Sequence, residues 1–261
     1  MSAPTGTVLE RILAETRQAV ERRKLVGIGE AAPRLPRGAG RPFRDALAAP
    51  GIGVIAEFKR RSPSAGTLHE APQLERIVAA YERGGAVAAS ILTEEPNFGG
   101  SLEDLSAARA ACTLPLLRKD FIVDPFQIEE ARCAGADAIL LIVAALEDRE
   151  LGSLQRTAAQ AGLDVLVEVH DSAELERALG VGAEIIGVNN RDLRDFSVDL
   201  ERTGRLMGEI PPGVIAVSES GISMPGQLDS LRESGVQAVL VGETLMRAAD
   251  PEAALRAIRG D

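Results

Sequence analysis

The sequence has no tryptophan, one tyrosine and only 3% aromatic residues, so aromatic rings cannot supply its core. Hydrophobic residues still make up 45% of the 261 positions, which is enough for a core of Ala, Val, Ile and Leu. No apolar run approaches the roughly 18 residues that a membrane-spanning helix needs. The first residues, MSAPTGTVLERILAE, lack the basic start and apolar stretch of a signal peptide, so we expect a cytoplasmic protein without membrane partners.

The sequence also has few cysteines and histidines, and its net charge is negative. Cys112 and Cys133 show no metal-ligand spacing and suit free thiols in a reducing compartment. The only histidines are His69 and His170, and no carboxylate spacing completes a metal site around them. A net charge of −10 argues against nucleic-acid binding, which draws on basic surfaces.

Short apolar runs alternate with helical segments from residue 53 onward. Before them, apolar residues at three- and four-residue steps predict a helix over 7–29, and the Pro-, Gly- and Arg-rich residues 30–51 predict a connection. Continuous apolar strands that alternate with helices indicate parallel strands buried on both faces. The eight runs lie at 53–59, 86–94, 114–121, 137–143, 164–169, 184–190, 214–220 and 237–243.

Eight strand–helix units with a period of about 20–35 residues predict a (β/α)₈ TIM barrel with an extra N-terminal helix. We expect a single domain over 1–261, in which 1–51 form the helical extension and connection. The rival is a doubly wound open sheet, which usually has a Gly-rich dinucleotide turn after its first strand. Here that turn reads EFKRRSPS, at 57–64.

Polar residues stand at the carboxyl ends of the predicted strands, where barrel enzymes assemble their active sites. By the two-residue period of a strand, they share a face with apolar residues earlier in the same strand. Taken singly, each is an ordinary solvated strand end, but together they predict a site in the barrel mouth. They are Glu57 and Lys59, Lys119 and Phe121, Glu168, Asn189 and Arg191, and Ser218 and Ser220.

Two glycines after the last two strands indicate a phosphate site. Gly221 in SESGI and Gly242 in VGETLMRA let a ligand approach the backbone closely, and barrels frequently bind phosphate at these loops. An anionic substrate needs local positive potential, which Lys59, Arg60 and Arg61 would supply from the neighbouring first strand. By strand parity, Lys59 faces the mouth and Arg60 points away from it.

A set of segments resembles the indole-3-glycerol-phosphate synthase family, in order and over nearly the whole chain: AEFKRRSPSAG, ILTEEPNFGGS, LLRKDFIVDPFQIEEA, LVEVHD, IGVNNRDL, SESGI and LVGETLMR. The resemblance implies a barrel with an N-terminal helix near its mouth and a carboxy-lyase of tryptophan biosynthesis. The implied substrate, 1-(2-carboxyphenylamino)-1-deoxyribulose 5-phosphate, is a phosphorylated and carboxylated small molecule. It closes to indole-3-glycerol phosphate with loss of carbon dioxide and water, without cofactor or metal.

The resemblance also implies roles for single residues. Lys119 is the general acid and Glu168 the general base of the dehydration. Lys59 binds the substrate carboxylate, Glu57 positions groups near the reacting carbons, and Asn189 belongs to the same catalytic set. The implied binding residues are Ser62, Arg191, Ser220, Gly221, Gly242, Glu243 and Thr244 for the polar parts of the substrate, and Phe98, Phe121, Leu140 and Leu193 for its aromatic end.

Two features depart from the family pattern. Some relatives carry a tryptophan in the N-terminal helix, and this chain has none. Glu243 stands where some relatives have a small hydroxyl residue and would repel phosphate if its side chain faced the ligand. We expect its backbone N–H to face the ligand, and Thr244 to offer the hydroxyl.

Two alternatives to this function remain open. One is another phosphosugar barrel, although such an isomerase would carry a Cys/Asp pair on its first and seventh strands and an epimerase would need more His ligands. The other is a barrel that binds a phosphorylated ligand without catalysis, against which the presence of both Lys119 and Glu168 argues. Monomer and homodimer are both compatible with the sequence.

Overall fold

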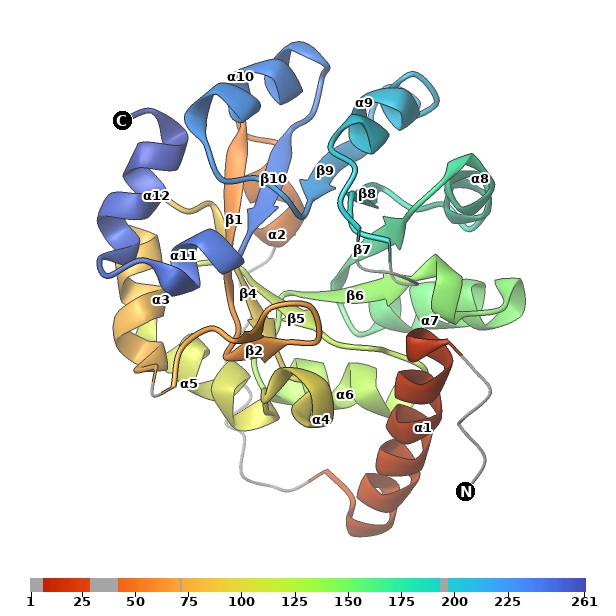
Figure 1. The fold of residues 1–261 in the computed structure, drawn as a ribbon. Helices are drawn as coiled ribbons and strands as arrows, with labels where there is room; N and C mark the ends of the chain where they lie inside the picture. Colours follow the sequence, from red (N-terminus) through yellow and green to blue (C-terminus); the bar gives the residue numbers. More distant parts are fainter. Residues whose placement is uncertain (1–6, 29–41, 71, 193–196) are drawn as a thin grey trace.

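Eight parallel strands close into a barrel that helices surround (Figure 1). The computed structural model describes residues 7–28, 42–70, 72–192 and 197–261. Neighbouring strands follow the order β1-β10-β9-β8-β7-β6-β5-β4, and pairing of β1 with β4 closes the ring. The barrel strands are β1 (Gly53–Phe58), β4 (Ala88–Leu92), β5 (Leu116–Lys119), β6 (Ala138–Ile142), β7 (Asp164–Val169), β8 (Ile185–Asn189), β9 (Ile215–Glu219) and β10 (Ala238–Val241).

Each barrel strand lies inside one of the predicted apolar runs, so the (β/α)₈ prediction is confirmed. Short polar side chains begin several of the outer helices. Ser101, Asp124, Asp171 and Asp250 each accept a hydrogen bond from a backbone N–H of the first turn. The outer helices are α3 (Leu74–Arg83), α5 (Leu102–Ala111), α6 (Pro125–Cys133), α7 (Asp148–Gln160), α8 (Ser172–Gly180), α9 (Glu201–Met207), α10 (Pro225–Glu233) and α12 (Pro251–Arg259).

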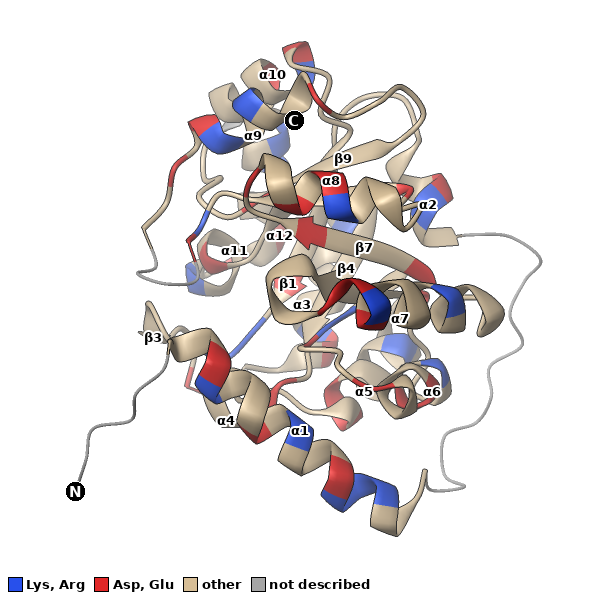
Figure 2. Cartoon of the chain, turned by 90° about the vertical axis from the view of Figure 1, so that its right-hand side faces the viewer, with Lys and Arg blue, Asp and Glu red and all other residues tan. Residues whose placement is uncertain are grey.

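The N-terminal helix α1 (Val8–Val26) packs on the outside of the barrel against α6 and the 3₁₀ turn η1 (Val143–Ala145) (Figure 2). It begins with a capping box, in which Thr7 and Glu10 satisfy each other's backbone N–H groups. Ile12 and Val20 are its buried residues. The predicted helix over 7–29 is therefore confirmed as far as Val26. Gly27 and Ile28 lie beyond its end, and residue 29 lies outside the described residues.

The predicted connection over 30–51 is wrong for its last part, since α2 (Pro42–Leu47) forms there. Phe43 and Leu47 of this helix are fully buried, and Asp164 at the start of β7 accepts from the Arg44 backbone N–H at 2.9 Å. Burial of two large apolar side chains outweighs the turn-forming composition around them. Smaller elements were also not predicted: β2 (Arg61–Ser62), β3 (Gly66–Thr67), α4 (Glu95–Phe98) and α11 (Glu243–Arg247).

Polar contacts bind α1 to the barrel through a buried arginine. Arg118 of β5 is 1% exposed and lies 2.8 Å from Asp120 and 3.4 Å from Glu130 of α6. Glu130 in turn accepts from Nε of Arg23 in α1 at 2.7 Å. A continuous ionic chain therefore runs from α1 through α6 to β5.

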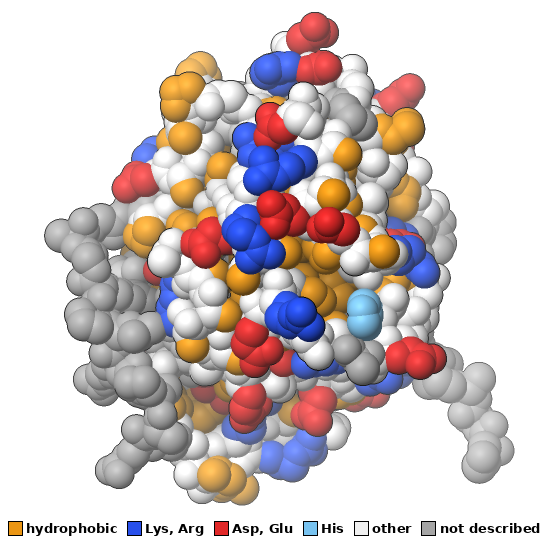
Figure 3. All heavy atoms as spheres, turned by 90° about the vertical axis from the view of Figure 1, so that its left-hand side faces the viewer, with side chains coloured by type: hydrophobic (Ala, Val, Ile, Leu, Met, Phe, Trp, Pro, Cys, Tyr) orange, Lys and Arg blue, Asp and Glu red, His pale blue; other side chains and the backbone are white. Residues whose placement is uncertain are grey.

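The surface over α3 and α12 interleaves acidic and basic side chains (Figure 3). Glu252 pairs there with Arg83 at 2.7 Å and with Arg256 at 3.2 Å. Both cysteines are free thiols, as predicted. Among the described residues, no helix has the length and apolar character needed to cross a membrane.

Replacing Arg118 should be severely destabilising. In Arg118→Met the carboxylates of Asp120 and Glu130 stay buried without this guanidinium, which should lower the free energy of unfolding by about 3–5 kcal/mol. Urea unfolding followed by circular dichroism measures the change. Arg17→Met, which removes a half-exposed pair with Glu150, is the control and should change stability by less than about 1 kcal/mol. Equal stability of Arg118→Met and wild type would contradict the structural role of this network.

Candidate active site

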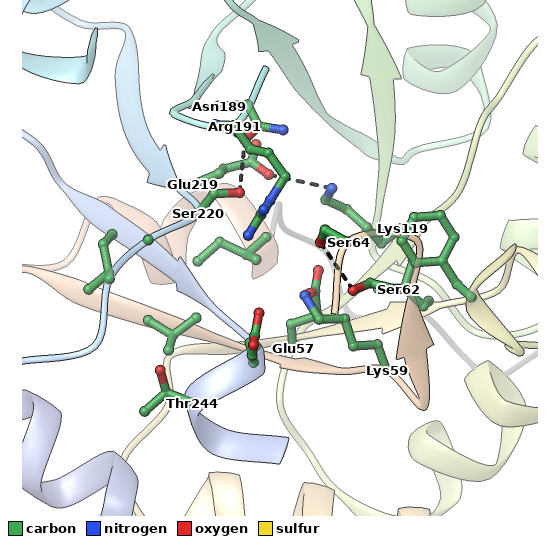
Figure 4. Close-up of a pocket in the computed structure, with 18 of the residues that line it drawn as sticks. Glu57, Lys59, Ser62, Ser64, Lys119, Asn189, Arg191, Glu219, Ser220 and Thr244 are labelled. Atoms are coloured by element: carbon green, nitrogen blue, oxygen red, sulfur yellow. Dashed lines mark hydrogen bonds and ion pairs between the residues drawn. The ribbon is translucent and has the colours of Figure 1, made fainter. Parts of the chain in front are cut away.

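A cavity of about 620 Å³ opens at the carboxyl ends of the barrel strands. Figure 4 shows Lys59, Lys119 and Arg191 reaching it from β1, β5 and the segment after β8. Each described residue to which the resemblance assigns a catalytic or binding role lines this cavity, so the sequence correctly predicted that they come together, whereas Ser218, also expected in the mouth, does not line it. Leu193, the remaining predicted residue, lies outside the described residues.

Lys119 is the electrostatic centre of the site. Its Nζ lies 3.3 Å from Oε2 of Glu168 on β7 and 3.5 Å from Oε2 of Glu219 on β9. Both carboxylates are 1% exposed. On the other side of Glu168, Asn189 of β8 donates from Nδ2 to Oε1 at 3.1 Å. One ammonium thus holds two buried carboxylates that would otherwise repel each other.

The two carboxyl groups have pKa values shifted in opposite directions. Burial raises the pKa of Glu168. Lys119, His170 and the hydrogen bond from Asn189 lower it by more than burial raises it, so the net shift is downward. Burial raises the pKa of Glu219 to about 7, because the nearby charges of Glu168 and Glu57 add to the burial and Lys119 offsets them only in part. Burial lowers the pKa of Lys119, yet its three carboxylate neighbours raise it above the ordinary value. Of the two carboxyl groups, Glu168 therefore stays ionised and Glu219 gains a proton first as the pH falls.

Glu219 was missed by the strand-parity argument, which placed Ser218 in the mouth. Ser218 is instead fully buried outside the barrel wall, where its hydroxyl accepts from Asn190 at 3.1 Å and lies 2.8 Å from Thr203 of α9. The alternation along β9 gives the inward position to Glu219. Ser220 still reaches the mouth because its backbone adopts φ 68°, and its hydroxyl donates to Asn189 Oδ1 at 2.9 Å. The sequence signal for Glu219 was a glutamate at the end of an apolar strand, in SESGI.

A glycine makes room for Glu219. Gly187 faces inward on β8, and a Cβ there would lie 2.1 Å from Oε1 of Glu219. Even alanine would thus displace the carboxylate, since a Cβ carbon stays at least about 3 Å from atoms to which it is not bonded. The glycine in IGVNN therefore serves the site although it carries no side chain.

Lys59 and Glu57 form a second ion pair at the mouth, 2.7 Å between Nζ and Oε1. The two side chains thus pair with each other, and both also line the cavity. Gly242 packs against this pair, and a Cβ at that position would lie 2.5 Å from Oε1 of Glu57. Gly242 therefore leaves room for the Lys59–Glu57 pair, besides being part of the cavity wall.

The three consecutive cations of EFKRRSPS do different things. Arg60 turns away from the cavity, as predicted, donates to Asp104 of α5 at 2.7 Å, and stacks on Phe58 with 5.2 Å to the ring centroid. Arg61 donates to the backbone carbonyls of Glu95 and Pro96 in α4. Only Lys59 of the three lines the cavity. The two arginines hold the segment after β4, which brings Phe98 to the site.

The opposite walls of the cavity differ in character. The apolar side has Phe98 and Phe121, with ring centroids 6.4 Å apart, next to Leu140. The polar side holds residues after β1, β8, β9 and β10: Ser62, Arg191, Ser220, Gly221, Gly242, Glu243 and Thr244. Such a division suits a ligand with an aromatic ring at one end and an anionic group at the other.

Glu243 begins α11 and its side chain runs along that helix, where Oε1 lies 3.1 Å from Nε of Arg247. The expectation that this carboxylate turns away from a bound anion is compatible with the pairing. Thr244 lines the cavity in the next position. Ser62 sits in the β2–β3 hairpin, and its hydroxyl accepts from the Ala65 backbone N–H at 3.1 Å.

Known proteins provide an independent comparison. The family model described as "Indole-3-glycerol phosphate synthase" matches residues 9–258. The chain is 47% identical to "Indole-3-glycerol phosphate synthase 2" of Streptomyces coelicolor, over 97% of this chain and 99% of that protein. It is also 47% identical to the "Indole-3-glycerol phosphate synthase" of Koribacter versatilis, over 98% of this chain and 100% of the relative.

Solved structures resemble the fold at much lower identity. A thiamine phosphate pyrophosphorylase from Pyrococcus furiosus aligns with a TM-score of 0.62 and 18% identity, over 84% of this chain and 96% of that one. An N-acetylmannosamine-6-phosphate 2-epimerase from Clostridium perfringens aligns with a TM-score of 0.60 and 15% identity, over 74% and 86%. These likenesses concern the barrel architecture alone.

Glu219 should make stability depend on pH. Its raised pKa means that the folded protein binds this proton more tightly than the unfolded chain, so stability should fall as pH rises from about 5 to about 8. In Glu219→Gln this contribution disappears. The stability of wild type relative to that variant should therefore drop by roughly 1–3 kcal/mol between those pH values. Urea unfolding at both pH values measures it, with the exposed Glu201→Gln as the matched control, and a constant difference would refute the raised pKa.

Proposed function

Since this chain belongs to the indole-3-glycerol phosphate synthase family, we propose that Lys119 and Glu168 carry the proton transfers of its reaction. The enzyme is a carboxy-lyase of tryptophan biosynthesis and binds a phosphorylated small-molecule substrate. The observation that carries the proposed roles is the position of Nζ of Lys119 in the cavity, 3.3 Å from Glu168 and 3.5 Å from Glu219. A proton donor and a proton acceptor thus stand side by side in one cavity.

Ring closure begins with Lys119 as general acid. The aromatic carbon that bears the carboxylate attacks the ketone carbon of the substrate, and the ketone oxygen takes a proton from the Lys119 ammonium. The carbon–carboxylate bond then breaks, carbon dioxide leaves, and its bonding electrons restore the aromatic ring. Partial neutralisation of the new alkoxide by a buried ammonium is the largest contribution that this site offers to that step.

Dehydration then depends on Glu168 as general base. The Lys59 ammonium, free once carbon dioxide has left, protonates the hydroxyl formed in the first step, which leaves as water. Glu168 takes a proton from the methylene carbon next to nitrogen, and the electrons of that C–H bond form the new ring double bond. The lowered pKa of Glu168 keeps it ionised and ready to accept. Glu168 then passes this proton to the amine of Lys119, 3.3 Å away, which restores both groups for the next turnover.

The remaining residues place the substrate. Lys59 takes the carboxylate that is later expelled, with Glu57 holding its ammonium. Phe98, Phe121 and Leu140 pack against the aromatic ring. The phosphate lies on the opposite, polar wall, against backbone N–H groups near Gly221 and Gly242 and the hydroxyls of neighbouring residues.

Loss of either proton-transfer residue should reduce turnover. Lys119→Ala should lower kcat by at least about 10²–10⁴-fold, the range for a lost general acid. Glu168→Gln should lower kcat with little change in substrate affinity, because the base acts after binding. Formation of indole-3-glycerol phosphate under steady-state conditions measures both. Lys24→Ala, a surface lysine on α1 that pairs with Asp124, is the control; near-normal kcat in Lys119→Ala would exclude its assigned role.

Lys59 and Arg60 should differ in their dependence on salt. Lys59→Met should weaken substrate binding by about 1.5–3 kcal/mol, the scale of a hydrogen bond to a charged group. Arg60→Met should change substrate binding only indirectly. It removes the contact with Asp104 that positions α5, and it removes a positive charge that attracts the anionic substrate from a distance, an effect that salt screens. Titrations of both variants at low and high ionic strength compare them. If Arg60→Met is the more damaging at high salt, Lys59 does not hold the carboxylate.

A further inference from the structure

His170 lies behind the proposed base rather than in the cavity. It is the first residue after β7, and it does not line the cavity wall that Glu168 helps to form. Its Nε2 faces Oε1 of Glu168 at 3.6 Å, on the oxygen that also accepts from Asn189. Any effect of His170 on the reaction must therefore pass through Glu168.

A second carboxylate holds the opposite edge of the ring. Glu174, in the first turn of α8, places Oε2 3.0 Å from Nδ1 of His170 and also accepts from the His170 backbone N–H at 2.7 Å. Asp171 in turn caps α8 by accepting from the Glu174 backbone N–H at 2.9 Å. The start of α8 thus fixes both the backbone and the ring of His170.

An imidazole between two carboxylates is favourable only when both nitrogens carry hydrogen. A neutral ring has one N–H and one lone pair, so one of its nitrogens would face a carboxylate oxygen lone pair to lone pair. Nε2 is buried and makes no hydrogen bond within the described part of the chain, which leaves Glu168 as the group it faces. The geometry therefore favours the imidazolium form, with one N–H toward each carboxylate.

The other charges around the ring come from β5, β7, α8 and α9. Burial lowers the pKa of His170, but Glu174 and Glu168 raise it above the ordinary value, with Arg202 of α9 opposing them. Arg202 is engaged elsewhere, since it donates to the Asn189 carbonyl at 2.8 Å. Lys119 lies on the other oxygen of Glu168. Glu168 is thus flanked by a cation on each side.

We propose that His170, held by Glu174, is a positioning residue that remains an imidazolium and keeps Glu168 ionised and correctly oriented toward the cavity. This inference rests on the proposed role of Glu168 as base. A base must be ionised to accept a proton, so the cation behind it extends activity toward lower pH. Without that cation the carboxylate would be protonated at higher pH, and the acidic limb of the pH–rate profile would move upward.

Nuclear magnetic resonance of ¹⁵N-histidine-labelled protein tests the charge directly. The chain has only two histidines, so His69→Asn assigns both rings. We expect the His170 ring to be doubly protonated at pH 7 and its ionisation midpoint to fall in Glu174→Gln, which keeps the shape of the holder and removes its charge. A neutral His170 ring at pH 7 in the wild type would overturn the proposal.

Single-turnover rates from pH 5.5 to pH 8.5 test the consequence. His170→Asn keeps an amide N–H for Glu174 but removes the nitrogen and charge that face Glu168. It should lose about threefold or more of the rate at the acidic end, with near parity at pH 8. A purely structural role would lower the rate equally at every pH, and an unmoved acidic limb would overturn the role of His170. Retention of the full rate in Glu168→Gln would instead overturn the proposed function, which leaves the two failures distinguishable.

Discussion

The ammonium of Lys119 is the constraint on which the rest of the site depends. It is the charge between Glu168 and Glu219, two carboxylates that are each 1% exposed and would repel each other without it. Other polar groups surround this centre. Asn189 donates to Glu168, and His170 faces the same carboxylate. Lys59 pairs with Glu57 at the cavity mouth. A buried cluster of this kind is costly unless every charge has a partner, so the surrounding barrel must hold it rigidly.

Neighbouring residues of β5 divide that task between two faces of one strand. Lys119 points into the barrel, and Arg118 points out into the chain of ion pairs that reaches α6 and α1. Gly187 and Gly242 contribute by having no side chain. The space that a side chain would occupy is filled by Glu219 at Gly187 and by Glu57 at Gly242. The geometry of the site thus depends as much on the residues behind and beside each strand as on the residues that line the cavity.

Most of this arrangement could be predicted from the sequence, because it follows from periodicity. The eight apolar runs contain the eight strands, and the two-residue alternation placed Glu57, Lys59, Lys119, Glu168 and Asn189 correctly. The same argument failed at β9. The positive φ of Ser220 turns a residue of outward parity into the mouth, so an alternation counted back from Ser220 assigns Ser218, and not Glu219, to the inward face. It also failed at α2, whose helix depends on burial of Phe43 and Leu47 against a distant part of the chain. Neither the left-handed backbone of Ser220 nor the long-range burial of α2 follows from a local pattern.

The first barrel strand pairs with the last, Gly53–Ala56 of β1 with Ala238–Val241 of β10, so the ring cannot be complete until residues 238–241 have been synthesised. Gly242, which leaves room for the Lys59–Glu57 pair, comes directly after that last strand. A nascent chain on the ribosome can form successive strand–helix units, but such long-range pairing must come last. A chain cut short before α11 would therefore leave one wall of the cavity missing, and truncated products of translation would be inactive however much of the barrel they had folded.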